Sequence, residues 1–137
     1  MRHDFYFVRH YYFESFALHH HFDQYLDWHH TNTRQAAAIV FGKVLGPRLG
    51  VPTNEKAVAS AEKGLKRSLK ILDKIVGEQS FVALPHLTIA DLSAFCELIQ
   101  LELASYPLEQ FTHLWKWYTE MKVCFSGSAF VFVHTSS

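Results

Sequence analysis

The sequence predicts an all-α protein, a small bundle of about four or five helices around one buried helix at residues 88–104. Three observations lead to this prediction. A capping signal opens residues 88–104, apolar residues recur at helical spacing over residues 58–76, and a glycine or proline separates most of the helical patterns. With 137 residues, the chain fits one domain that can bury a core without disulfides.

The central helix is predicted from its start signal and its composition. Thr88 and Asp91 have the spacing of a capping box, in which each side chain satisfies a backbone N–H of the other residue. We interpret both as structural residues. Apolar residues then fall on almost every side as far as Ala104, so we expect a helix buried from most directions, with Cys96 inside it.

The clearest helical period follows residues 53 and 54, either of which can cap the helix that it opens. Its apolar positions step by three or four, and Gly77 is expected to end it in a left-handed conformation. Its other side carries a basic stripe of Lys63, Lys66, Arg67, Lys70 and Lys74. A solvated face explains the stripe better than a nucleic-acid face, because no aromatic residues stand between these cations.

The other helices are predicted less sharply. One helix is expected from Phe22 to about Leu45, where Gly46-Pro47 interrupts it, and another follows Tyr106-Pro107. The inward side of that last helix is assigned to Leu108, Phe111, Leu114, Trp115, Tyr118 and Met121. Ser126-Gly127-Ser128 is expected to break it, leaving Phe130–Val133 as a strand or a sticky tail.

These patterns divide the chain into three parts. Residues 22–123 form the predicted helical domain, and residues 124–137 are a tail without assignment. Residues 1–21 are rich in aromatic residues and histidine and are also unassigned, with helix expected from about Tyr11.

The bulk composition restricts the partners. Thirteen basic residues balance thirteen acidic ones, so we expect neither nucleic acid nor an acidic membrane as a partner. No apolar run is long enough to span a bilayer, and the N-terminus does not resemble a signal peptide. The two cysteines do not suggest a disulfide framework, which favours a reducing compartment, and we expect the cytoplasm.

Residue types alone indicate no active site. Asp23, Asp27 and His30, with His19 one turn earlier, could meet on one side of a helix as metal ligands. Their spacing matches no known metal motif, so surface residues are the preferred interpretation and no metal is predicted. There is no glycine-rich nucleophile turn or phosphate loop, and no catalytic residue is predicted.

Three separated segments, however, resemble one family. They read DQYLDWHHTNTR from Asp23, LGPRLGV from Leu45 and LTIADL from Leu87, and the chain is similar over residues 23–122 to the C-terminal helical domain of theta-class glutathione transferases. The resemblance implies a helical domain that contributes an electrophile pocket. It also implies glutathione as co-substrate, hydrophobic electrophiles as partners, and no other cofactor.

The resemblance also implies site residues. Arg34 matches the family arginine that helps to stabilise the glutathione thiolate, since a nearby cation lowers the pKa of a thiol. Ala38 and Phe41 lie one and two turns further along and would line an apolar substrate pocket. Without the resemblance, Arg34 would be interpreted as a surface residue and the other two as helix core.

The chain departs from the family at several points. Leu84 stands where relatives usually have a glycine, so a turn that needs a positive φ there would be strained. The thioredoxin-like domain that activates glutathione in the family is missing, which suggests a truncated product that is inactive alone. Such a product should self-associate through a bare apolar surface unless residues 1–21, with their seven aromatic residues, fold back over it. The alternative function is a non-catalytic helical interaction module of the elongation factor 1 gamma type.

Overall fold

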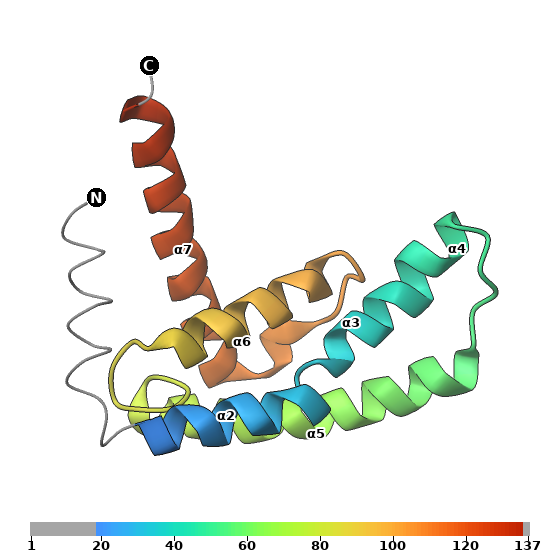
Figure 1. Ribbon diagram of the computed structural model, residues 1–137, viewed down its shortest axis with the longest axis horizontal. Coiled ribbons are helices and arrows are strands. Elements are labelled where there is room, and N and C mark those ends of the chain that lie inside the picture. The colour runs from blue at the N-terminus through green and yellow to red at the C-terminus, as the bar shows by residue number, and fades with distance from the viewer. Residues whose placement is uncertain (1–18, 136–137) are drawn as a thin grey trace.

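The computed structural model describes the backbone of residues 19–135 and the side chains of residues 23–126. This part of the chain contains helices, turns and loops but no strand, which confirms the all-α prediction (Figure 1). Helix from Tyr11 to residue 18 falls outside the described residues. In chain order the elements are α2 (His19–Thr31), α3 (Gln35–Val40), the π-helix η1 (Phe41–Leu45), α4 (Gly46–Arg48), α5 (Glu55–Gln79), α6 (Ile89–Ile99), the 3-10 helices η2 (Gln100–Glu102) and η3 (Leu108–Gln110), and α7 (Thr112–Thr135).

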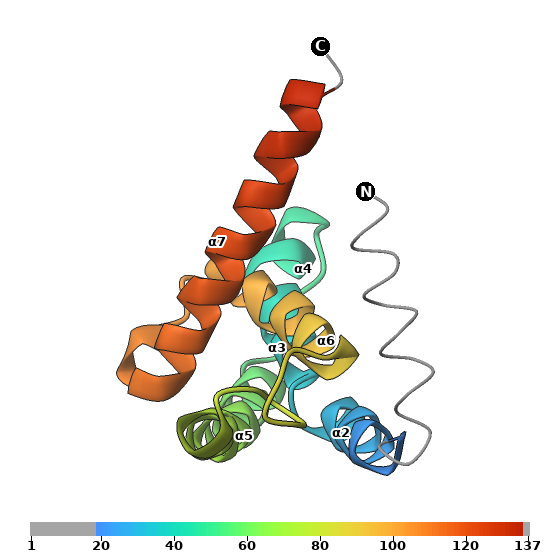
Figure 2. The ribbon, with the colours of Figure 1, turned by 90° about the vertical axis from the view of Figure 1, so that its left-hand side faces the viewer.

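The longest helix, α5, runs along one edge of the molecule, and both views show the other helices arranged to one side of it (Figures 1 and 2). It packs against α3 and α7, while α2 packs against α6. Burial of apolar side chains between these helices is the main force that holds them together. The core is drawn from all of them and includes Tyr25, Ile39, Leu65, Leu69, Leu72, Leu98, Leu101, Leu114, Trp117 and Tyr118.

The first predicted helix is in fact two helices, so the single helix expected from Phe22 to Leu45 is wrong. The chain turns at residues 32–34, between α2 and α3. Asn32 Nδ2 donates to the Trp28 carbonyl at 2.8 Å, and the Thr33 hydroxyl donates to the His29 carbonyl. Short polar side chains that bind the carbonyls of the preceding turn compete with helix continuation, which explains the break.

The predicted interruption at Gly46-Pro47 is also wrong, because helical backbone continues through both residues. Phe41–Leu45 winds as a π-helix, and the Gly46 N–H donates to the Phe41 carbonyl. Pro47 then lies in the first turn of α4, where its missing N–H needs no partner. α4 ends at Arg48, and two residues later Gly50 has a φ of 75°, a left-handed conformation that glycine adopts without strain.

α5 has the predicted period but a different end. Asn54, one of the two proposed caps, accepts a hydrogen bond from the Ala57 N–H. The left-handed residue at the other end is Ser80, not Gly77, which lies within the helix. A Cβ at Gly77 would come within 2.9 Å of the His113 ring, so this glycine allows α7 to approach closely. Close packing against His113, rather than the predicted left-handed conformation, explains the glycine at this position.

α6 is shorter and less enclosed than the sequence predicts. It ends at Ile99, followed by η2, rather than reaching Ala104. It buries Ala90, Ala94, Phe95 and Leu98, but an outer row of Ile89, Leu92, Cys96 and Ile99 is exposed. A period of 3.6 residues places these four on one side of the helix, and in this structure no described residues cover that side.

The loop before α6 does not contain the strain expected at Leu84. Among the described residues, the non-glycine residues with positive φ are Ser80 and Ser105, so Leu84 needs no left-handed conformation. Its side chain is buried in the core.

α7 differs from the prediction in which tryptophan it buries and in where it ends. Trp117, rather than Trp115, faces the core, and the helix passes through Ser126-Gly127-Ser128 to Thr135. The strand expected at residues 130–133 is therefore wrong, since one glycine costs only about 1 kcal/mol in a helix and need not end it. The C-terminal half of α7 projects away from the other helices (Figures 1 and 2).

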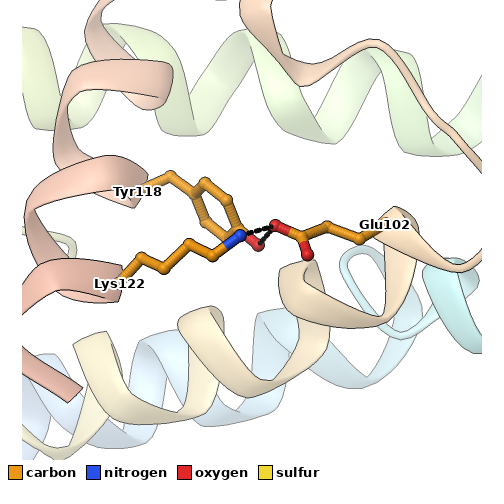
Figure 3. Close-up of polar contacts among 3 residues, drawn as sticks. All are labelled: Glu102, Tyr118 and Lys122. Atoms are coloured by element: carbon orange, nitrogen blue, oxygen red, sulfur yellow. Dashed lines mark hydrogen bonds and ion pairs between the residues drawn. The ribbon is translucent and has the colours of Figure 1, made fainter. Parts of the chain in front are cut away.

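A polar cluster fixes α7 against the end of η2 (Figure 3). Tyr118 donates its hydroxyl hydrogen bond to Glu102 Oε1 at 2.8 Å, and the Lys122 ammonium group forms an ion pair with the same oxygen. Lys122, then Tyr118, lower the pKa of Glu102 by stabilising its carboxylate. The Tyr118 ring itself is buried, so the cluster joins the core to the surface.

Candidate functional site

Asp91 forms a buried polar centre that the sequence revealed only in part. Both bonds of the predicted capping box are present between Thr88 and Asp91. Asp91 Oδ2 accepts from the Thr88 N–H at 2.9 Å, and Thr88 Oγ1 accepts from the Ala90 N–H. Asp91 Oδ1 also accepts from the Val82 N–H at 2.9 Å and from Trp117 Nε1 at 3.1 Å.

These contacts give Asp91 a wider structural role than capping. The carboxylate has no exposure to solvent, so burial raises its pKa while the surrounding donors oppose that change. Its partners come from the loop before α6, from the start of α6 and from α7. Reasoning from the sequence missed Val82 and Trp117, because local spacing carries no signal for partners nine and twenty-six residues away.

The three residues assigned to substrate binding lie in one exposed row beside α3. Arg34 immediately precedes the helix, Ala38 lies within it, and Phe41 follows it. All three are exposed, with 48% of Phe41 accessible, so none of them belongs to the core. Leu45, one further turn along, is 45% exposed and extends the row, although the sequence did not single it out.

Arg34 is held by a neighbour on α2. Its Nη1 lies 3.0 Å from Nδ1 of His30, four residues earlier, and because a guanidinium only donates, Nδ1 of His30 is the acceptor of this bond. The next residue, His29, is buried and its Nδ1 lies 2.8 Å from the Leu26 carbonyl. Burial lowers the pKa of His29, and electrostatic interactions with His30 and Arg34 lower it further, while Glu97 opposes them.

The candidate metal ligands do not come together as a site. Asp23, Asp27 and His30 are each exposed along α2. Over the described residues, no group of three His, Cys, Asp or Glu side chains is arranged to hold a metal ion. Within the same part of the chain, no helix combines the length and the apolar character needed to cross a bilayer.

The family profile "Glutathione S-transferase, C-terminal domain" matches residues 55–120, which extend from α5 into α7. Glutathione S-transferase T1 of Arabidopsis thaliana is 49% identical over 82 residues, a match that covers 57% of this chain and 34% of that protein. Glutathione S-transferase T3 of the same plant is 50% identical over 82 residues, covering 57% of this chain and 14% of its own length.

Animal proteins match the same region. Human glutathione S-transferase theta-2B is 36% identical over 87 residues, which are 62% of this chain and 36% of that protein. The match thus spans about a third of the length of the T1 and theta-2B relatives. No solved structure matches the chain. Residues 55–120 are therefore similar to the C-terminal domain of glutathione S-transferases, and the proteins that match the chain include theta-class transferases.

Proposed function

We propose that residues 22–123 form the electrophile-binding part of a theta-like glutathione transferase site, with Arg34, Ala38 and Phe41 contacting the substrates. The observation that carries this proposal is the exposed row beside α3, in which a cation, Ala38, an aromatic ring and Leu45 follow one another along one side. A conjugate of glutathione with an apolar group has a matching composition, since it joins a charged tripeptide to a hydrophobic substituent.

Arg34 is suited to a role near a thiolate. A guanidinium stays charged at every physiological pH, and its field favours the ionised form of a nearby thiol. The bond to His30 limits the directions in which the guanidinium can point. Phe41 and Ala38 would then contact the electrophile, because they continue the same side of the helix toward η1.

Binding of S-hexylglutathione, measured by calorimetry on the 137-residue chain, tests this assignment. We expect Arg34→Ala and Phe41→Ala each to weaken binding several-fold, because the first removes the charge contact and the second the apolar contact. Lys116→Ala is the control, since Lys116 is an exposed cation on α7, on a different helix from the row. Equal effects of Arg34→Ala and Lys116→Ala would contradict the assignment.

Turnover is a separate prediction. The chain offers Arg34 for the thiol but no loop that we recognise as a holder of the glutathione backbone, and positioning supplies much of the acceleration of such a reaction. The electrostatic interaction of a single exposed charge with the thiolate is worth under about 1 kcal/mol. We therefore expect this chain to conjugate glutathione to an alkyl or aromatic halide no faster than the uncatalysed reaction. Robust turnover that Arg34→Ala abolishes would refute the predicted inactivity.

We further propose that the protein works in the cytoplasm. Both cysteines are free and exposed, which suits a reducing compartment. The non-catalytic interaction module remains the alternative function. Two results together would favour that alternative. The parent chain and an Arg34→Ala/Phe41→Ala variant would both retain a partner protein, and neither would bind glutathione conjugates.

A further inference from the structure

α5 presents five cations on its solvent side, the basic stripe of Lys63, Lys66, Arg67, Lys70 and Lys74, all of them exposed. Each of them lies three or four residues from another member of the stripe, so they share one side of the helix. The opposite side is packed into the core through Leu65, Leu69 and Leu72. The stripe therefore lies on the side of α5 that faces away from the core.

The stripe is uncompensated within the described part of the chain. None of its five side chains forms an ion pair or a hydrogen bond with another described residue. Two carboxylates of the same helix have partners elsewhere, since Glu62 pairs with Lys43 of η1 and Asp73 Oδ1 accepts from the Leu114 N–H at 2.8 Å. Like charges three or four residues apart repel and destabilise a helix. Binding of an anion would remove this repulsion.

We propose that the basic stripe is a docking surface for an acidic helical segment of a partner protein. Carboxylates three and four residues apart on a helix have the same spacing as the cations of the stripe, so two such helices can pair along their length. Ile71, at the edge of the stripe, is 47% exposed and offers an apolar contact beside the charged ones.

Other anionic partners fit the stripe less well. A nucleic acid is attracted by a basic domain, whereas this chain has thirteen basic and thirteen acidic residues and no aromatic side chain within the stripe on which a base could stack. A membrane-bound helix inserts its apolar side into lipid, but the apolar side of α5 is already buried in the core. This proposal is independent of the row beside α3.

The test uses a fluorescently labelled helical peptide of alanine and glutamate, about 16 residues long, with its glutamates three and four residues apart. Binding to the full chain is measured by anisotropy, beside a peptide of the same composition with its glutamates spread around the helix. Arg67→Glu/Lys70→Glu reverses two charges in the stripe. Arg48→Glu/Lys116→Glu is the matched control, because it reverses one arginine and one lysine that are equally exposed elsewhere.

We expect the stripe variant to lose about tenfold in affinity and the control variant less than about twofold, since several close charge contacts are reversed only in the first. The patterned peptide should also bind more tightly than the spread one. Arg67→Gln/Lys70→Gln, which removes charge without adding any, should lie between parent and stripe variant. The proposal would be overturned if the stripe and control variants lost the same affinity, or if the patterned peptide did not bind. It would also be overturned if an oligonucleotide or phosphatidylserine vesicles bound more tightly than the patterned peptide.

Discussion

At the scale of single residues, Asp91 shows how one side chain can connect distant parts of a fold. Its two oxygens accept from the backbone of Val82 and Thr88, from the Thr88 hydroxyl and from the Trp117 indole. The capping part of this arrangement is local and could be predicted from the spacing of Thr88 and Asp91. The bond to Trp117 depends on how α7 crosses α6, and the sequence assigned the inward position to Trp115 instead.

Replacement of Asp91 tests the importance of these bonds. We expect Asp91→Ala to lower the free energy of unfolding by about 3 kcal/mol, because it removes a helix cap and leaves buried donors without partners. Trp117→Phe should lower it by about 1 kcal/mol, since one bond is lost while the ring is kept. Both are measured by urea unfolding.

The control for this prediction is Glu120→Ala on α7, an exposed carboxylate that should change stability by less than about 0.5 kcal/mol. If Asp91→Ala unfolded at the same urea concentration as the parent chain, the argument from buried donors would be wrong.

At the scale of the elements, the C-terminal end of α5 was not predicted correctly from the sequence. Ser80 closes the helix with a φ of 72°, a left-handed conformation that costs a residue with a Cβ roughly 1 kcal/mol. Ser80→Gly should therefore raise the free energy of unfolding by about 0.5 to 1 kcal/mol. Ser60→Gly, at an exposed position inside the same helix, should lower it by a similar amount. Thermal unfolding of the two variants checks both signs, and a loss of stability in Ser80→Gly would contradict the prediction.

The attachment of α7 to η2 should depend on pH through Glu102 (Figure 3). Because Lys122 and Tyr118 lower the pKa of Glu102 in the folded chain, its stabilisation is complete above the unfolded value of 4.5 and is lost as the pH falls through the folded value. Because the Glu102 carboxylate is exposed, we expect it to contribute under about 1 kcal/mol to the free energy of unfolding.

This pH dependence is measured as the difference in unfolding free energy between the parent chain and Glu102→Gln. The difference should be constant from pH 7 to about pH 5 and should decrease below about pH 4.5. Glu109→Gln, which removes an exposed carboxylate from η3, is the control. A difference that grows toward acid pH would show that the sign is wrong.

At the scale of the whole molecule, the exposed apolar side of α6 should govern association. Ile89 is 49% and Ile99 is 39% exposed in the outer row of this helix. Contiguous apolar surface promotes contact between proteins, so we expect the chain to self-associate in light scattering at micromolar concentration. The double substitution Ile89→Gln/Ile99→Gln should shift the association equilibrium toward the monomer. Ile71→Gln/Val123→Gln, which changes two exposed apolar residues elsewhere, should not. A parent chain that stays monomeric would contradict this prediction.

The sequence by itself determined the helical class, the cap at Thr88, a cap for α5 at residue 53 or 54, and the buried side of α5, because each depends on residues a few positions apart. Only the tertiary structure decided which side of α6 is left open, which tryptophan reaches Asp91 and why Gly77 is a glycine. Those features depend on the approach of α7 to α5 and α6. The row of Arg34, Ala38 and Phe41 lies between these cases. Its spacing is local, but its exposure to solvent results from where the other helices pack.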